Sequence, residues 1–174
     1  TVPLMSRVSA LLLVAIVSPA AVALPDDLRQ VVVRFGSVAS VIPSEVEAAI
    51  AEGVRVVDLD SRYQHSAFLL EDGRVYCMGE NTQGQCDVPE EIGQPGKAAV
   101  QIAVGNFHTM ALTEDGEVYC WGLGGDGQLD IPDGVGDPKN PVTQIAASGK
   151  TSVALLEDGT MYWWGFNDGY PPSP

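Results

Sequence analysis

The chain has 174 residues, of which 45% are hydrophobic and 18% are charged, and this balance excludes an intrinsically disordered protein. The formal net charge of −14 creates a field that repels phosphate, so we expect no nucleic-acid partner and regard basic protein surfaces as the better complement. The 19 glycines and 12 prolines indicate many short strands joined by tight turns.

Residues 8–25 form an uncharged run near the start of the chain. Residues 5–23 can be interpreted as a signal peptide, with a basic start at Arg7, an apolar middle and small residues for cleavage at 21–23. In that case the protein is secreted or lumenal; otherwise an intracellular location is favoured. A membrane span is the second interpretation, but Pro19 and the short length of the run count against it.

The interpretation that we favour for the same run is a pair of β-strands. Residues 14–16 and 22–24 align, with one constant offset, with residues 145–147 and 153–155. Cleavage after residue 23 would also leave a predicted strand at residues 31–35 without its hairpin partner, which would expose a strand edge.

The next segment carries a strand, a helix and another strand. Val31–Gly36 lies 43 residues before the matching strand of the first clear repeat, so we interpret it as the last strand of a degenerate earlier repeat. Ser44-Glu45-Val46-Glu47 has the pattern of a capping box and predicts one short helix near residues 44–52, which Gly53 would end. A strand is expected at Val54–Leu59.

A tandem repeat of 43 residues dominates the rest of the chain. The tripeptide Glu-Asp-Gly occurs three times at this spacing, at residues 71–73, 114–116 and 157–159. A short apolar strand precedes each tripeptide and a β-branched and aromatic strand follows it, while the glycine permits a positive φ, so each unit predicts an antiparallel hairpin. One unit cannot bury both of its faces, so neighbouring units must stack.

We expect the repeated apolar positions to be largely buried between neighbouring units. These positions are Leu69, Leu112, Leu155, Tyr76, Tyr119, Tyr162, Cys77, Cys120 and Trp163.

The repeat resembles the regulator of chromosome condensation repeat. The resemblance is carried by Ile102–Leu112, then Glu114-Asp115-Gly116, then Val118–Gly122 and Gly127-Gln128, and it covers roughly Leu59 to Gly165. The family forms β-propellers, commonly of seven blades, that serve as protein-interaction discs. Some members are nucleotide exchange factors for small GTPases and others are modules of ubiquitin ligases.

The resemblance and the chain length together give the expected fold. We expect an all-β, partial and open propeller of about four blades, with residues 31–174 holding the repeats and residues 1–30 holding degenerate first strands or a signal peptide. Four blades of this curvature would form an arc whose open edges pair with another chain or with residues outside this sequence. The competing expectation is a small closed ring, in which residues 31–35 pair with residues 161–165.

The residue types that carry chemistry all have structural interpretations here. Cys77 and Cys120 share a repeat position that a tryptophan fills in the third unit, so we interpret them as core residues. His65 and His108 also align, and Thr151 takes their place in the third unit, which indicates a structural hydrogen bond to a neighbouring turn. The Glu-Asp-Gly carboxylates are interpreted as solvated turn residues, and residues 126–130 lack the spacing of a calcium loop. We therefore expect no catalytic residues, no cofactor and no metal.

The loops between repeats are acidic, and they carry the functional expectation. From residue 80 to residue 140 there are eleven Asp or Glu residues against Lys97 and Lys139. We expect a non-catalytic scaffold that binds a basic protein. Nucleotide exchange on a small GTPase, or a role as a secreted or lumenal structural subunit, is the alternative. The candidate interaction surface consists of Glu80, Asp87, Glu90, Glu91, Asp126, Asp130, Asp133 and Asp137.

Overall fold

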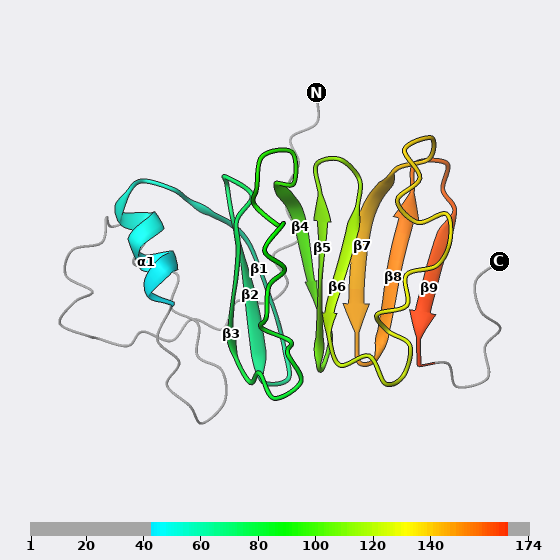
Figure 1. The fold of residues 1–174 in the computed structure, drawn as a ribbon, viewed down its shortest axis with the longest axis horizontal. Helices are drawn as coiled ribbons and strands as arrows, with labels where there is room; N and C mark the ends of the chain where they lie inside the picture. Colours follow the sequence, from blue (N-terminus) through cyan, green and yellow to red (C-terminus); the bar gives the residue numbers. More distant parts are fainter. Residues whose placement is uncertain (1–42, 167–174) are drawn as a thin grey trace. The chain divides into compact units, whose positions relative to one another are not determined.

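The computed structural model describes residues 43–166. Within this range one helix, α1 (Ser44–Ala51), precedes nine strands (Figure 1). They form three antiparallel sheets of three strands each, in the orders β1-β2-β3, β4-β5-β6 and β7-β8-β9. The strands are β1 (Val56–Arg62), β2 (His65–Leu70), β3 (Val75–Gly79), β4 (Ala99–Val104), β5 (His108–Thr113), β6 (Val118–Gly122), β7 (Val142–Ser148), β8 (Thr151–Leu156) and β9 (Met161–Gly165).

The sequence repeat is also a repeat of backbone register. His65, His108 and Thr151 each pair with the glycine that ends the third strand of their own sheet. The first and second strands of every sheet share one irregularity, which falls between residues 56 and 58, 99 and 101, and 142 and 144. Each 43-residue unit therefore builds one blade, and the chain folds as a partial all-β propeller.

The Glu-Asp-Gly hairpins form as the sequence predicts. Gly73, Gly116 and Gly159 have φ values of 83°, 84° and 88°, which confirms the expected positive φ. Each of these glycines donates its backbone N–H to the carbonyl three residues earlier, at 2.9–3.0 Å. These short turns hold the second and third strands of each blade together.

Each described blade has three strands, whereas propeller blades usually have four. The connecting segments 80–98 and 123–141 form turns and bends instead of a further strand. Their glycines and prolines explain this difference, because proline cannot donate to a strand ladder and glycine favours turns. As a consequence, each connecting segment crosses the blade from one end of the strands to the other (Figure 1).

The hydrophobic core lies in two layers between successive blades. Val104, Ala111 and Trp121 belong to the layer shared by the first and second blades, together with Leu69. Met110 and Leu112 belong to the layer shared by the second and third blades. Stacking therefore buries the faces that one repeat alone would expose.

The core prediction is confirmed for two of the leucines, but the other predicted positions are less buried than expected. Leu69 and Leu112 are buried, whereas Leu155 and the tyrosine, cysteine and Trp163 positions are half-buried. The tyrosines and cysteines lie on the third strand of each sheet, which has a neighbouring strand on one side only. Every residue of β2 and β5 is buried, but only alternate residues of β8 are, so Leu155 lies on a face that no other blade of residues 43–166 covers.

The helix forms where expected, but its predicted cap is wrong. Pro43 occupies the N-cap position, and Ser44 is already helical, with its hydroxyl donating to the Glu45 carboxylate at 3.0 Å instead of to the backbone. The fixed φ of proline positions the first turn without a side-chain cap. Gly53, with φ of 89°, follows the helix end as predicted.

The expected strand at Val54–Leu59 lies slightly later, as β1. The proposed strands in residues 8–35 lie outside the described residues. The choice between an open arc and a closed ring depends on residues 31–35, so it stays a prediction. Among residues 43–166, no helix has the length and apolar character needed to cross a membrane.

Candidate functional site

The blades present two edges at opposite ends of their strands. The first edge carries the Glu-Asp-Gly turns, and we call it the EDG edge. Here the end of each connecting segment is hydrogen-bonded to the turn of the next blade: Glu114 N–H donates to Ala98 O at 2.8 Å, and Glu157 N–H donates to Pro141 O at 3.0 Å. At the second, the opposite edge, Leu123 N–H donates to Phe107 O at 2.8 Å. The EDG edge comprises residues 71–74, 90–98, 114–117, 133–141 and 157–159. The opposite edge comprises residues 62–65, 80–87, 105–108, 123–130, 149–151 and 166.

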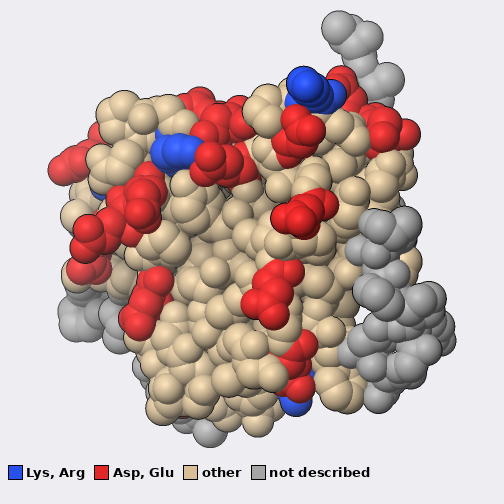
Figure 2. Space-filling model, turned by 45° about the vertical axis from the view of Figure 1, so that its right-hand side comes forward, with Lys and Arg blue, Asp and Glu red and all other residues tan. Residues whose placement is uncertain are grey.

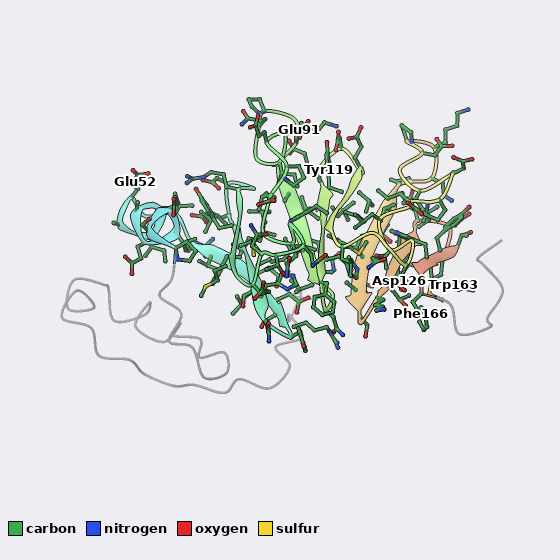
Figure 3. The ribbon with its side chains drawn as sticks, turned by 60° about the horizontal axis from the view of Figure 1, so that its bottom comes forward. Glu52, Glu91, Tyr119, Asp126, Trp163 and Phe166 are labelled. Atoms are coloured by element: carbon green, nitrogen blue, oxygen red, sulfur yellow. The ribbon has the colours of Figure 1, made fainter. Side chains whose placement is uncertain are left out.

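The structure divides the eight predicted acidic residues between these edges. Glu90, Glu91, Asp133 and Asp137 belong to the EDG edge, and Glu80, Asp87, Asp126 and Asp130 belong to the opposite edge. Figure 3 shows the separation, with Glu91 at one end of the molecule and Asp126 at the other. The eight residues are therefore two sets of four, and not one surface.

Three of the four carboxylates of the opposite edge already have partners in the described structure. Glu80 accepts the Thr82 backbone N–H at 3.1 Å, and hydrogen bonding from Thr82 lowers the pKa of Glu80. Asp87 accepts the Asn81 side-chain amide at 2.8 Å, and Asp126 pairs with Lys150 at 3.0 Å. These acids stabilise loop conformations, which reduces what they can offer to a partner.

The EDG edge has ion pairs that tie neighbouring blades together. Lys97 leaves the connecting segment of the first blade and reaches Asp115 at 2.5 Å and Glu117 at 2.6 Å on the turn of the second. The hydrogen bond from Lys97 lowers the pKa of Asp115 to about 2, so this carboxylate is ionised throughout the ordinary pH range. On the first blade, Arg74 pairs with Asp72 at 2.7 Å.

Negative charge remains at this edge after those pairs are formed. Glu90, Glu91 and Asp133 are exposed, and within residues 43–166 their carboxylates take part in no ion pair or hydrogen bond. Asp137 is also exposed and accepts only the nearby Lys139 backbone N–H, at 2.9 Å. Figure 2 shows acidic side chains gathered along the upper margin of the molecule, with few basic ones between them.

The two histidines link successive blades through buried hydroxyl groups. His65 Nε2 lies 3.0 Å from Thr109 Oγ1, and that hydroxyl donates to the Gln85 carbonyl at 2.8 Å. His108 repeats the arrangement one blade later. The predicted structural role is thus confirmed, although each ring contacts a hydroxyl of the next blade and not a turn. Thr109 and Ser152 were missed by the sequence interpretation, yet a hydroxyl residue recurs at this repeat position.

The cysteines are free thiols that pack within the fold. Cys77, Cys86 and Cys120 are half-buried, and burial raises the pKa of Cys120 to about 12. A protonated thiol of this kind is a weak nucleophile and a weak metal ligand. Among residues 43–166, no cluster of three or more His, Cys, Asp or Glu side chains could hold a metal ion.

Comparison with known families and structures gives consistent matches. The model of the Regulator of chromosome condensation (RCC1) repeat matches residues 56–85, 99–128 and 142–169, and a second model of the same repeat matches residues 72–112. These ranges coincide with the three blades. No curated protein sequence matches the chain.

Among solved structures, human WBSCR16 is 31% identical with a TM-score of 0.54, over 67% of this chain and 35% of that one. Yeast RCC1 (Prp20), solved with Kap60, is 27% identical with a TM-score of 0.54, over 66% of this chain and 30% of that one. The ectodomain of the Physcomitrella patens receptor kinase CR4 is 22% identical with a TM-score of 0.52, over 68% and 30% respectively, and supports the fold alone. The chain thus spans about a third of the length of these structures.

Proposed function

This chain belongs to the Regulator of chromosome condensation (RCC1) repeat family, and on that premise we propose that it is a non-catalytic protein-interaction module whose EDG edge binds a basic protein partner. Members of this family are interaction modules or exchange factors and not classical enzymes. The yeast relative was solved in a complex with another protein, Kap60, which supports a protein as the partner class.

One observation carries the choice of the EDG edge. Its exposed carboxylates at Glu90, Glu91 and Asp133 lack partners among the described residues, whereas Glu80 and Asp87 of the opposite edge are held by their own loop and Asp126 pairs with a lysine of the next blade. Binding a basic surface here would not first require an internal ion pair to break. Such complementarity raises association rates and selects partners by charge.

The rigidity of this edge also favours recognition. The turns at 114–116 and 157–159 are fixed by backbone hydrogen bonds and by the connecting segments that contact them. A surface that is already ordered loses little conformational entropy when it binds. The same blade scaffold can therefore present acidic loops in a fixed arrangement.

A second part of the proposal concerns the face of the third sheet that lies away from the second blade. In the second blade, Ala103 and Met110 are buried against the third sheet. At the equivalent positions of the third blade, Ala146 is exposed and Val153 is half-buried. Met161 is 51% exposed on the same sheet. We propose that a repeat blade from another chain covers this open face, because apolar positions used for blade stacking recur there.

A titration with a lysine-rich peptide, followed by backbone amide NMR shifts of the full chain, tests the EDG edge. The expected result is that amides of residues 90–94 and 133–137 shift first and saturate together. Shifts concentrated at residues 80–87 and 126–130, which hold the acids of the opposite edge, would reject this assignment. A nucleotide-release assay with a panel of small GTPases separates the alternative function, and we expect no stimulation of release.

A further inference from the structure

The hairpin between β1 and β2 has an unusual backbone at Tyr63. Tyr63 has a φ of 58°, and it is the one non-glycine residue with positive φ among residues 43–166. The equivalent tip of the third blade carries Gly149, with a φ of 57°. A bulky residue is disfavoured in this left-handed conformation, so glycine would suit the turn better. Such strain is often retained at functional positions.

The Tyr63 side chain is presented to solvent instead of being packed away. It is 62% exposed, and its ring lies edge-on to Phe107 on the tip of the second blade, with centroids 5.1 Å apart and planes at 65°. Phe107 itself is half-buried. The pair is therefore an aromatic platform on the opposite edge, in which the partly buried ring supports the exposed one.

Arg62 places a positive charge next to this platform. Asp60 reaches the second blade, where its carboxylate accepts the Val104 backbone N–H at 2.7 Å. Arg62 follows Asp60 by two residues on the same strand and so leaves the strand on the same side. Arg62 is exposed and has no ion pair among the described residues, unlike Arg74 and Lys97.

We propose that Arg62, Tyr63 and Phe107 form a second interaction site, which binds a peptide segment of a partner protein that presents a carboxylate beside an aromatic or aliphatic side chain. The guanidinium group pairs with the carboxylate, and the apolar side chain packs on the two rings. Arginine and tyrosine, like tryptophan, are enriched where binding energy concentrates in protein interfaces. This site goes beyond the proposed function, because it lies on the other edge and selects the opposite charge.

The test uses two peptides that differ in one residue. The first is acetyl-Gly-Glu-Phe-Leu-Gly-amide and the second has lysine in place of glutamate. Dissociation constants for this tip are obtained from the amide NMR shifts of residues 62–64 and 105–108 in the full chain. We expect the glutamate peptide to shift amides near residues 62–64 and 105–108 and to bind at least about tenfold more tightly than the lysine peptide. Equal affinities, or no shift at this tip, would overturn the proposal.

Variants separate a binding role from a structural one. Tyr63→Gly should lose about tenfold in affinity for the glutamate peptide and keep or raise its melting temperature, because glycine relieves the left-handed backbone. Arg62→Gln should weaken the same affinity, and Lys139→Gln, an exposed lysine of the EDG edge, should leave it unchanged. The tip is structural and the proposal fails if Tyr63→Gly lowers the melting temperature. It also fails if the Tyr63→Gly and Arg62→Gln variants both bind the glutamate peptide as tightly as the parent chain does.

Discussion

His108 Nε2 lies 3.0 Å from the hydroxyl oxygen of Ser152 in the next blade. Ser152 donates its own hydroxyl proton to the Gln128 carbonyl at 2.8 Å, so the imidazole must be the donor in the first contact. This fixes the proton on Nε2 and leaves Nδ1, which is buried and has no partner among the described residues, as an acceptor. The same relationship joins His65 to Thr109 one blade earlier.

The first prediction is a loss of stability in acid that depends on His108. Burial, together with the nearby His65, lowers the pKa of His108 from 6.5 to about 4. The unfolded chain therefore binds more protons between these values, and the free energy of unfolding falls as the pH drops from about 6.5 to about 4. Protonation would place an unpaired N–H at Nδ1 in the core.

Urea unfolding at neutral pH and near pH 4.5 measures this effect, with His108→Gln as the comparison. The variant should be less stable at neutral pH by about 1–2 kcal/mol, because the bond to Ser152 is altered, but its stability should depend less on pH. Identical pH dependence in the parent and the variant would contradict the assigned titration. Acidic residues titrate in both proteins and cancel in the comparison.

The second prediction compares two glutamines at the same repeat position. Gln101 bridges blades, because its side-chain amide donates to Ile145 O at 2.9 Å and its carbonyl accepts Ile145 N–H at 2.8 Å. Gln144, its counterpart on β7, is exposed on the open face of the third blade. We expect Gln101→Ala to cost about 1–3 kcal/mol of unfolding free energy and Gln144→Ala to cost less than about 0.5 kcal/mol.

Chemical denaturation of the isolated chain measures both glutamine variants. The comparison also bears on the open face, because a bound blade should make Gln144 as important as Gln101. Equal costs in the isolated chain would show that the third blade is already covered in the same way as the second.

The third prediction concerns two glycines with the same backbone and different surroundings. Gly73 and Gly159 both have positive φ, so alanine at either position is strained by about 1 kcal/mol. A methyl group at Gly73 would also collide with Ala98, whereas nothing lies within 4 Å of the equivalent position at Gly159. Gly73→Ala should therefore lower the thermal midpoint clearly more than Gly159→Ala, as calorimetry can show. The reverse order would mean that the two turns were assigned the wrong neighbours.

The repeat made the blades predictable, because the period and turn chemistry are local properties that recur unchanged. The helix cap was mispredicted since the local pattern at Ser44 competes with Pro43, whose fixed φ starts the helix one residue earlier. The three strands of each unit were predictable as well, because residues 80–98 and 123–141 have turn composition and an apolar strand follows the first of them at residues 99–104.

The functional surface was less predictable than the fold. Glu80 and Glu91 lie in the same connecting segment, yet that segment carries them to different edges. The repeat alignment also gave no signal for Tyr63, because Asn106 and Gly149 stand at the equivalent positions. Non-repeated residues on a repeated scaffold are where function must be read from the structure.

The most direct test of the proposed interaction surface uses two matched sets of charge removals and a fluorescent lysine-rich peptide. One variant combines Glu90→Gln, Glu91→Gln, Asp133→Asn and Asp137→Asn on the EDG edge, and the other combines Glu80→Gln, Asp87→Asn, Asp126→Asn and Asp130→Asn on the opposite edge. Both lose the same net charge, so nonspecific attraction changes equally. If the EDG edge is the binding surface, the dissociation constant rises about tenfold in the first variant and less than about threefold in the second. Equal weakening in both variants, or a greater loss in the second, would contradict the assignment of partner binding to the EDG edge.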